Sequence, residues 1–440
     1  MKKTFLILFI LTSFFATAQK TVLITNVKIF NGKDNKTVNG NVLITDNAIT
    51  KISTAPIPTN KSAMTTIIDG KGKFLMPGLI DAHVHTMFES IQMTVGLSSD
   101  IGYVNIVAAK AAENQLLRGF TAVRDLGGSS FSLKRSIDEG YVKGPRIFPS
   151  GATISQTSGH GDFGAPTDVP KDPSRPLSYI ERSGQTIVAD GVDQVLMRTR
   201  EQLRQGATQI KVMAGGGVSS SYDPLDVAQY TEEELSAAVK AAAGWNTYVT
   251  VHAYTPTAVQ AAIKAGVKCI DHGHLLDDAT AKIMAEKGIW WSLQPFQDDE
   301  DAAPFPEGSD ARKKFLQIVE GTENAYKLAK KYNIKLAFGT DILFDPKLAK
   351  RQGAQLAKMV KWFTPFEVLK MATSDNASLL EMSGPRNPYK RKLGVIEEGA
   401  FADLILVDGN PLENINLVSN PDKNFVLIMK NGEVIKNTIQ

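Results

Sequence analysis

The stretch YVTVHAYTPTAVQAAIKAGVKCIDHGHLLDDATAKIMAEKGIWWSL, residues 248–293, alternates between two patterns. Apolar runs at Tyr248–Ala253, Val267–Asp271 and Ile289–Leu293 have the length of buried strands. The two segments between these runs, TAVQAAIKAG and DATAKIMAEKG, are typical of helices. Strands that alternate with helices in this way predict β–α–β units that share a parallel sheet.

The same alternation continues on both sides of this stretch. Further strand-length runs lie at residues 79–84, 122–126, 146–150, 209–214 and 334–339, and helical patterns separate most of them. Eight such alternations in roughly 300 residues match the size of a (β/α)8 TIM barrel. A doubly wound open sheet remains an alternative, because hydrophobic periodicity does not show whether a sheet closes on itself. We expect the barrel to occupy residues 77–389.

The two ends of the chain share a different pattern. Residues 20–74 and the segment from Leu393 onward contain short runs rich in Val, Ile and Thr, broken by Asn-Gly and Asp-Gly. Such runs favour antiparallel strands joined by tight turns. The simplest interpretation is that residues 19–76 and 390–440 together form one small β-sandwich domain beside the central α/β domain.

The first 18 residues predict a secretory signal peptide. Lys2 and Lys3 precede an apolar run at residues 5–15, and Ala16-Thr17-Ala18 is a small-residue cleavage site. An uncleaved membrane anchor is the alternative, but the apolar run is short for spanning a bilayer. We therefore expect a protein exported to the periplasm or the extracellular space, with no membrane attachment after cleavage.

The composition is that of a globular protein, without signs of nucleic-acid binding and without the cysteines for an internal disulfide. The 440 residues are 43% hydrophobic and 22% charged, with a net charge of only +3. No basic run, and no basic patch with interleaved aromatic residues, indicates nucleic-acid binding. The single cysteine, Cys269, excludes an internal disulfide. Stability must therefore come from the hydrophobic core.

Histidines and one aspartate stand at the ends of several expected strands. His83 and His85 form a His-x-His pair, whose spacing on a strand places both imidazoles on one face. His252, His272 and Asp341 each end a separate apolar run. In a (β/α)8 barrel the carboxyl ends of the strands carry the active site. Four imidazoles and a carboxylate on that face suit a divalent metal such as zinc, although a buried structural histidine explains any one of them alone.

Lys211 lies in the strand-like segment QIKVMAGGGV, residues 209–218, where an unpaired ammonium group would be costly. Next to bound metal ions its pKa would fall, because the cations repel a protonated amine. A neutral lysine can react with carbon dioxide to form a carbamate (N6-carboxylysine), an anion able to bridge two metals. The alternative is a structural lysine whose ammonium group reaches solvent.

Together these motifs resemble the amidohydrolase superfamily. They are PGLIDAHVH, GFTAVRDLGG, QIKVMAGGG, VTVHAY, DHGHLLD, FGTD and GVIEEGAFADLILVD, and they extend in the family's order from Met76 to Asp408. Within the superfamily, the chain is similar to the branch with a carboxylated lysine and two metals. The most similar group is prolidase-like and imidazolonepropionase-like, and it includes Xaa-Pro and Xaa-Arg dipeptidases and ochratoxin-cleaving amidases.

This resemblance implies two divalent metal ions, zinc being the expected element, and a mechanism. The implied ligands are His83, His85 and Asp341 for one ion, His252 and His272 for the other, and carboxylated Lys211 as a bridge. A hydroxide that bridges the metals would attack the carbonyl carbon, with Asp341 as general acid and base. Imidazolonepropionases use one metal and lack the bridging lysine, so Lys211 argues against that activity.

Further side chains have expected roles near the substrate. Tyr230, in AQYTEEEL, resembles the group's tyrosine that donates to the substrate carbonyl oxygen; its structural alternative is a half-buried aromatic residue before a helix. His160, in SGHGD on a long connection, is expected to contact the substrate or its oxyanion. His274 either orients a metal ligand or is a polar loop residue. Two candidates for the substrate carboxylate, by position only, are Arg124 and Arg198.

The sequence therefore predicts an exported, metal-dependent amidohydrolase that cleaves the amide bond of a dipeptide or an N-acyl amino acid. Two long connections, residues 151–194 and 294–310, would overhang the active-site face and set substrate choice. One alternative is a mononuclear imidazolonepropionase-like cyclic-amide hydrolase or aminohydrolase. Another is a non-catalytic binding protein on the same scaffold. The expected partner is a small-molecule amide substrate, and a homo-oligomer stays open.

Overall fold

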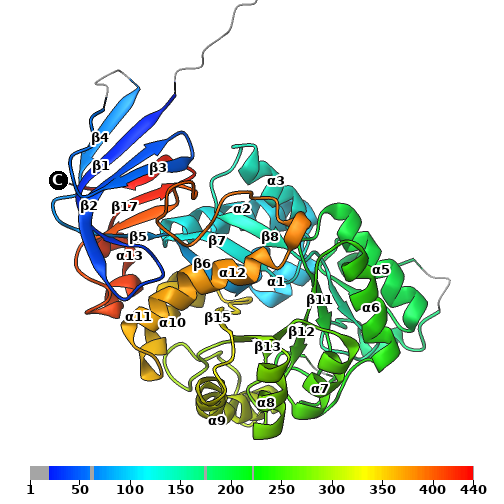
Figure 1. The fold of residues 1–440 in the computed structure, drawn as a ribbon. Helices are drawn as coiled ribbons and strands as arrows, with labels where there is room; N and C mark the ends of the chain where they lie inside the picture. The colour runs from blue at the N-terminus through cyan, green and yellow to red at the C-terminus, as the bar shows by residue number, and fades with distance from the viewer. Residues whose placement is uncertain (1–18, 60–63, 173–175, 221, 440) are drawn as a thin grey trace, which may run out of the picture.

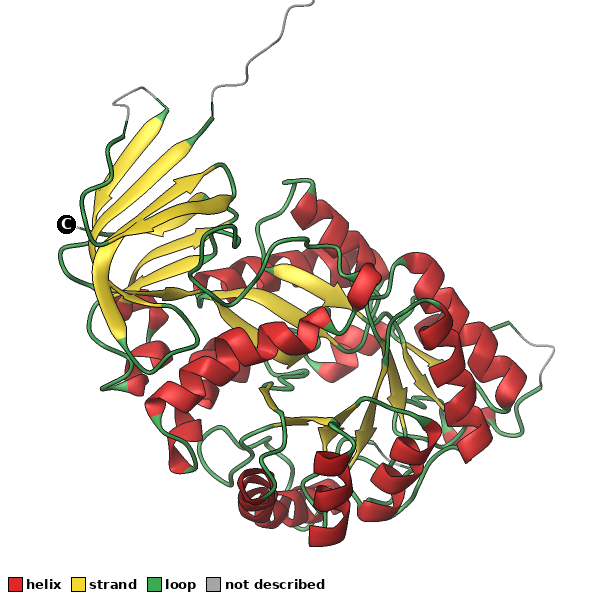
Figure 2. Cartoon of the chain, viewed as in Figure 1, coloured by secondary structure: helices red, strands yellow, loops and turns green. Residues whose placement is uncertain are grey.

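The computed structural model describes residues 19–59, 64–172, 176–220 and 222–439 (Figure 1). The predicted signal peptide, residues 1–18, lies outside these described residues. Within them, no helix is both long enough and apolar enough to cross a membrane. The chain folds into a parallel α/β part and, to one side of it, a sheet built from both chain ends (Figures 1 and 2).

Two parallel sheets form the centre of the α/β part. The smaller sheet has the strand order β6-β7-β8, and the larger has the order β10-β9-β11-β12-β13-β14-β15. Neighbouring strands are parallel throughout both sheets. The strands are β6 (Leu79–Val84), β7 (Phe120–Asp125), β8 (Arg146–Pro149), β9 (Thr153–Ser155), β10 (Thr186–Val188), β11 (Ile210–Met213), β12 (Val249–Ala253), β13 (Cys269–His272), β14 (Trp290–Leu293) and β15 (Leu336–Phe338). The parallel α/β centre expected from the sequence is therefore confirmed.

The two parallel sheets adjoin each other at two places. Only residues 150–152 separate β8, in the smaller sheet, from β9, in the larger one. On the opposite side, the N–H group of Asp341, which follows β15, donates to the carbonyl oxygen of His83 on β6 at 2.8 Å. This junction depends on Gly339, because a Cβ there would lie 2.4 Å from the Cβ of His83. The carboxyl ends of β6 and β15 therefore lie side by side.

Helices pack outside the parallel strands. Figures 1 and 2 show α5 to α9 along the outer side of β11 to β15. Local sequence sets several helix ends: Thr231 and Ser309 accept backbone N–H bonds as N-caps of α6 and α9, and Pro256 begins α7. The helices are α1 (Met93–Ser98), α2 (Ile101–Leu117), α3 (Phe131–Asp138), α4 (Tyr179–Arg182), α5 (Val192–Gln205), α6 (Glu232–Gly244), α7 (Pro256–Ala265), α8 (Asp278–Glu286), α9 (Asp310–Lys331), α10 (Gln352–Lys358), α11 (Pro365–Lys370), α12 (Asn376–Glu381) and α13 (Pro421–Asn424). Shorter helical turns are η1 (Pro166–Asp168), η2 (Leu348–Arg351), η3 (Met359–Lys361), η4 (Met371–Asp375), η5 (Gly384–Arg386) and η6 (Ile415–Ser419).

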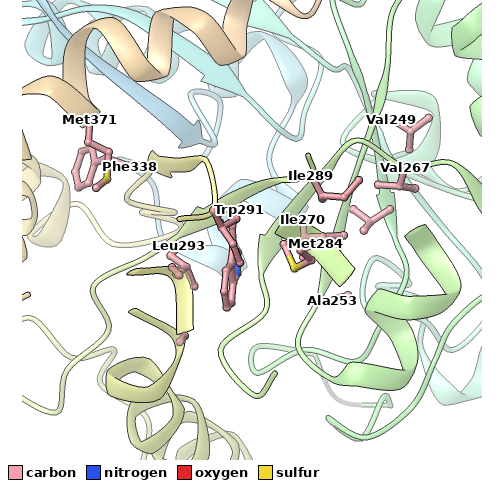
Figure 3. Close-up of a cluster of buried hydrophobic side chains, with 14 of the residues drawn as sticks. Val249, Ala253, Val267, Ile270, Met284, Ile289, Trp291, Leu293, Phe338 and Met371 are labelled. Carbon is pink, nitrogen blue, oxygen red and sulfur yellow. The ribbon is translucent and has the colours of Figure 1, made fainter. Parts of the chain in front are cut away.

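The largest hydrophobic cluster includes side chains of the parallel strands and of the helices around them. Figure 3 shows part of it, including Val249, Ile270 and Met284. Trp291 on β14 is fully buried, and its Nε1–H group donates to the carbonyl oxygen of His272 at 2.6 Å. Each fully buried apolar side chain of this kind contributes about 1.5–3 kcal/mol. Packing of the core thus also fixes the backbone at the end of β13, where His272 lies.

Strands from the two chain ends form one further sheet. Its order is β18-β17-β16-β5-β1-β2-β3, and β4 pairs with β1. The strands are β1 (Thr21–Phe30), β2 (Thr37–Thr45), β3 (Ala48–Ser53), β4 (Thr65–Asp69), β5 (Phe74–Pro77), β16 (Leu404–Val407), β17 (Phe425–Lys430) and β18 (Glu433–Asn437). Gly78 alone separates β5 from β6, so this sheet leads directly into the first parallel strand. Its sandwich form and the domain boundaries stay predictions.

Candidate metal centre

His83, His85 and Asp341 form a compact cluster where the two parallel sheets meet. His83 lies on β6, His85 follows that strand, and Asp341 follows β15. The Nε2 atoms of the two imidazoles lie 3.2 Å and 3.1 Å from Oδ1 of Asp341. One possible ligand atom from each residue lies within 4.8 Å of the other two, which is close enough to hold one metal ion.

His252 and His272 lie beside this cluster. They come from β12 and β13, and their ring centroids are 4.4 Å apart. The ring of His272 is 5.0 Å from that of His83, and its Nε2 atom is 3.8 Å from Oδ2 of Asp341. The structure thus brings together all five residues that the sequence placed at strand ends. Their role as metal ligands stays a prediction.

Protonation and hydrogen bonding of these histidines fit metal binding. Burial lowers the pKa of His83 to about 4, and it lowers the pKa values of His252 and His272 well below the usual value. The imidazoles are therefore neutral at pH 7, each with a lone pair to offer. The Nδ1 atom of His272 is buried without a hydrogen-bond partner among the described residues. Nitrogen and oxygen donors of this kind suit zinc.

Two of these residues have unusual backbone conformations. His272 has a φ of 75° and Asp341 a φ of 53°, in the left-handed region that residues other than glycine rarely adopt. Such strain costs about 1–3 kcal/mol per residue and persists only where the surrounding structure enforces it. Here Trp291 binds the carbonyl group of His272, and His83 binds the N–H group of Asp341. Enforced strain of this kind is typical of functional sites.

Lys211 lies on β11, lines the same cavity as the histidines, and is only 1% exposed. Its Nζ atom lies 2.6 Å from Oδ2 of Asp271, a buried carboxylate on β13. Nη2 of Arg124, on β7, lies 2.7 Å from Oδ1 of the same carboxylate. Burial opposes ionisation of Asp271, but the charges of Lys211 and Arg124 outweigh it and hold its pKa well below the usual range. The alternative of a lysine that reaches solvent is therefore wrong.

Neither arginine considered for the substrate carboxylate lines the cavity. Arg124 is fully buried, and besides Asp271 it contacts the carbonyl oxygen of Ala82 at 2.6 Å. Arg198 lies on α5 and pairs with Glu201 at 3.0 Å. The structure therefore does not support either positional candidate, because each arginine pairs with a carboxylate outside the cavity.

Tyr230 does not face the metal cluster. Its hydroxyl donates to the carbonyl oxygen of Ala189 at 2.9 Å, and it is not among the residues that line the cavity. This geometry corresponds to the structural alternative considered for Tyr230, and it gives no support to the expected donor role.

Tyr254 was missed by the sequence analysis, although it stands two residues after His252 in VHAY. It lines the cavity, and its ring centroid lies 5.0 Å from those of both His252 and His272. Burial raises the pKa of Tyr254 well above the usual value, so its hydroxyl keeps its proton. Tyr254 therefore offers the cavity a protonated donor beside the histidines.

His160 and His274 differ in their access to the cavity. His160 lines it, and its ring stacks on that of His252 at a centroid distance of 4.1 Å. His274 is fully buried and does not line the cavity; its Nε2 atom lies 2.9 Å from the carbonyl oxygen of Gln294. His274 thus holds the start of the second long connection, whereas His160 is placed to contact a bound molecule.

The cluster lies in a cavity of about 630 Å³ with a largely apolar wall. Both long connections contribute to the wall, Phe163 from the first and Phe296 and Phe305 from the second. The phenylalanines that line the cavity are Phe88, Phe163, Phe296, Phe305, Phe315 and Phe344. No arginine of the described residues lines it, and the lining lysines are Lys211, Lys347 and Lys358. A cavity of this size and character suits a small organic molecule.

Comparison with known proteins identifies the family. The family model for amidohydrolases matches residues 74–436. The chain is also 33% identical over 408 residues to ochratoxinase from Aspergillus niger, which covers 90% of this chain and 83% of that protein. The chain belongs to the amidohydrolase family, and it is therefore a hydrolase acting on amide bonds. The resemblance based on the sequence motifs is thus confirmed.

Solved structures support the same grouping. A prolidase complexed with N-methylphosphonate-L-proline has a TM-score of 0.86 and 33% identity, covering 95% of this chain and 100% of that one. The A. niger ochratoxinase structure has a TM-score of 0.82 and 29% identity, covering 95% and 96%. A Xaa-Pro dipeptidase with methionine bound in its active site has a TM-score of 0.79 and 29% identity, covering 94% and 99%. These likenesses agree with the prolidase-like group.

Proposed function

We propose that this protein is a metal-dependent amidohydrolase that releases an amino acid from a dipeptide or an N-acyl amino acid. The observation that carries the proposal is the convergence of four imidazoles, a carboxylate and Lys211 on one apolar cavity. The scaffold in this proposal is a (β/α)8 barrel of β6, β7, β8 and β11 to β15, supported by the junctions on both sides of the two sheets. The likenesses to ochratoxinase and prolidase support amide substrates.

We infer that two divalent ions, zinc being the expected element, bind in this cavity. The residues that would hold them are His83, His85 and Asp341 for one ion, His252 and His272 for the other, and Lys211 carboxylated on Nζ as the bridge. When bound, such ions supply Lewis acidity and lower the pKa of water towards about 7. Burial lowers the pKa of Lys211, which favours the neutral amine that reacts with carbon dioxide.

Three side chains of the cavity would carry out the proton transfers and stabilise the developing negative charge. Asp341 lies between the two groups of histidines, so it takes up the proton of the attacking water and returns it to the leaving nitrogen. Tyr254 donates to the carbonyl oxygen in place of Tyr230, because it is protonated and no described residue accepts its hydrogen bond. His160 contacts the same developing negative charge as a second donor.

The cavity wall favours a substrate with a large apolar group. Burying an aromatic or large aliphatic group against the phenylalanines of the wall contributes roughly 1.5–3 kcal/mol. A charged group at the same place would lose its hydration without an arginine to pair with it. Lys347 lines the cavity without an ion pair to any described residue, so we assign it to the carboxylate of the substrate.

A panel of dipeptides and N-acyl amino acids tests the proposed function. Protein loaded with zinc or manganese is incubated with each compound, and the free amino acid released is measured. We expect fastest release from compounds with a large apolar acyl group. Folded, metal-loaded protein that releases nothing from the whole panel would refute the assignment. Asp341→Asn preserves the size of the side chain and is the matched inactive control.

We also propose export with cleavage after Ala18, which the charged and apolar pattern of the first residues supports. N-terminal sequencing of protein isolated from the periplasm or the medium checks this. We expect the sequence to begin at Gln19. Recovery of the protein with its original N terminus, in the cytoplasmic fraction, would contradict export.

A further inference from the structure

Lys314 on α9 donates its ammonium hydrogens to three backbone carbonyl groups. Its Nζ atom lies 3.1 Å from the oxygen of Gly217, 3.3 Å from that of Ser220 and 2.8 Å from that of Asp223. All three acceptors belong to the loop after β11, here named the glycine loop (residues 215–220 and 222–223). The loop and α9 are far apart in sequence, since 91 positions separate Lys314 from Asp223.

This arrangement gives the glycine loop a cation at its centre. Three carbonyl oxygens that converge on one point repel each other unless a positive charge lies between them. A lysine ammonium has three donors and no acceptor, so Lys314 satisfies all three oxygens with one side chain. The conformation of the glycine loop therefore depends on a charge that a distant helix supplies.

The glycine loop in turn holds His160. Oδ2 of Asp223 accepts a hydrogen bond from the N–H group of Gly217 at 2.7 Å and lies 3.4 Å from Nδ1 of His160. Oγ of Ser220 lies 2.7 Å from the same nitrogen. Gly217 lies so close to the imidazole that a Cβ there would be 1.9 Å from Nδ1. These contacts occupy Nδ1 and fix the ring position.

The glycine loop also holds His252. The carbonyl oxygen of Gly216 lies 3.0 Å from Nε2 of His252. This bond leaves Nδ1 of His252 as the nitrogen available to a metal. Because the ring of His252 stacks on that of His160, the two imidazoles are fixed together. One loop thus orients a candidate metal ligand and a candidate substrate contact.

We propose that Lys314 is a positioning residue for hydrolysis: it is the built-in cation of the glycine loop and thereby fixes the imidazoles of His160 and His252. Lys314 does not line the cavity, so it acts only through the loop. This inference rests on the proposed function, but the order of the glycine loop is measurable without any substrate.

Amide hydrogen exchange tests the dependence of the loop on this cation. Lys314→Met removes the charge and retains an apolar stem of similar length. Lys313→Met is the matched control, because Lys313 is on the same helix and pairs with Asp310 on the surface at 3.1 Å. Exchange in peptides 209–220 and 222–231 should become faster in Lys314→Met and stay unchanged in Lys313→Met. Unchanged exchange in Lys314→Met would overturn the proposal.

Kinetics and chemical rescue separate positioning from a general loss of structure. With a substrate that the wild type hydrolyses, Lys314→Met should lower kcat by roughly 10- to 100-fold with little change in KM, because the catalytic groups are misplaced.

Lys314→Ala leaves space for propylammonium, which should restore slow exchange and much of the rate. Folded Lys314→Ala that responds no more than Lys313→Ala would overturn the role of internal cation. If the wild type hydrolyses nothing, the proposed function fails, while exchange and its rescue still decide the role of Lys314.

Discussion

Nζ of Lys211 and Oδ2 of Asp271 lie 2.6 Å apart, with both side chains buried. Arg124 contacts the other oxygen of this carboxylate, so one buried anion lies between two buried cations. An unpaired ion at such depth would cost several kcal/mol. The contact therefore explains how an apolar strand holds a lysine in the metal-free protein. In the proposed enzyme, carboxylation of Lys211 exchanges this ion pair for a bridging ligand.

Lys211→Ala should reduce bound metal from two ions per chain to about one, because the bridge is lost. Loss of an outer partner of a metal ligand alone costs about 10–100-fold in affinity or activity, so loss of the bridge should slow hydrolysis by at least ~100-fold. The fold should survive, since Asp271 keeps its contact with Arg124. Metal analysis and the rate of amino-acid release check this. Retention of both metals and the full rate would contradict the carbamate assignment.

Tyr254→Phe should lower kcat by about 100- to 1,000-fold, because it removes the donor to the carbonyl oxygen. Tyr230→Phe should leave kcat near that of the wild type. It should instead cost about 0.5–1.5 kcal/mol of stability, because it loses the hydrogen bond to Ala189. Steady-state kinetics and thermal unfolding of both variants make the comparison. The reverse pattern would return the donor role to Tyr230.

Phe305→Ala should weaken the preference for substrates with large apolar groups. Phe305 lies on the second long connection and contacts Phe315 at a centroid distance of 6.0 Å. Loss of this apolar surface should lower kcat/KM by roughly 10- to 100-fold for an N-benzoyl amino acid. The N-acetyl amino acid with the same leaving group is the internal control, and its kcat/KM should change little. Equal losses for both substrates would place Phe305 outside the specificity pocket.

Asp125, at the end of β7, is fully buried, and its Oδ2 atom has no hydrogen-bond partner among the described residues. Burial raises the pKa of Asp125 from 3.8 to about 6. The folded protein therefore binds this proton more tightly than the unfolded chain does. Asp125 therefore contributes stability that is lost as the pH rises from about 4 to about 6, and this contribution adds to those of the other buried groups. Asp125→Asn has nearly the same shape, cannot ionise, and should lack this one contribution.

Denaturant unfolding of the metal-free wild type and Asp125→Asn, at about pH 4 and about pH 7.5, measures this difference. Between the two conditions the wild type should lose on the order of 1–3 kcal/mol more stability than the variant. Asp310→Asn, at an exposed position on α9, should behave as the wild type does. The same pH dependence in Asp125→Asn and the wild type would contradict a raised pKa for Asp125.

Local sequence patterns predicted the convergence of the candidate ligands and the parallel strands β6 to β8 and β11 to β15, but not the short strands β9 and β10, which lie in the expected long connection at residues 151–194. Apolar runs reflect burial directly, and polar residues at the ends of parallel strands meet at one edge whatever the details of packing. The expected run Ile289–Leu293, for example, differs from β14 by one residue. For the same reason His252 and His272, from neighbouring strands, lie as close as expected.

These sequence patterns did not predict the direction of individual side chains or the contacts between residues far apart in the chain. Tyr230 and Tyr254 both follow strands of the larger parallel sheet, but a φ of 67° at Tyr230 and the acceptor at Ala189 take its hydroxyl away from the cavity. Asp271 stands directly before His272, yet its contact with Lys211 joins β13 to β11 across the intervening strand β12. Lys314 gives no local signal, because its three acceptors lie in a different part of the chain.

Zinc titration of the metal-free protein, with amide hydrolysis as the readout, tests most directly whether this protein is an amidohydrolase that needs two metal ions. Zinc is added stepwise in the presence of bicarbonate, and release of the amino acid from an N-acyl amino acid is measured at each step. The rate should rise to a maximum at two zinc ions per chain and be lost on chelation. A maximum at one ion would identify the mononuclear alternative, and no release at any zinc content would contradict a metal-dependent amidohydrolase.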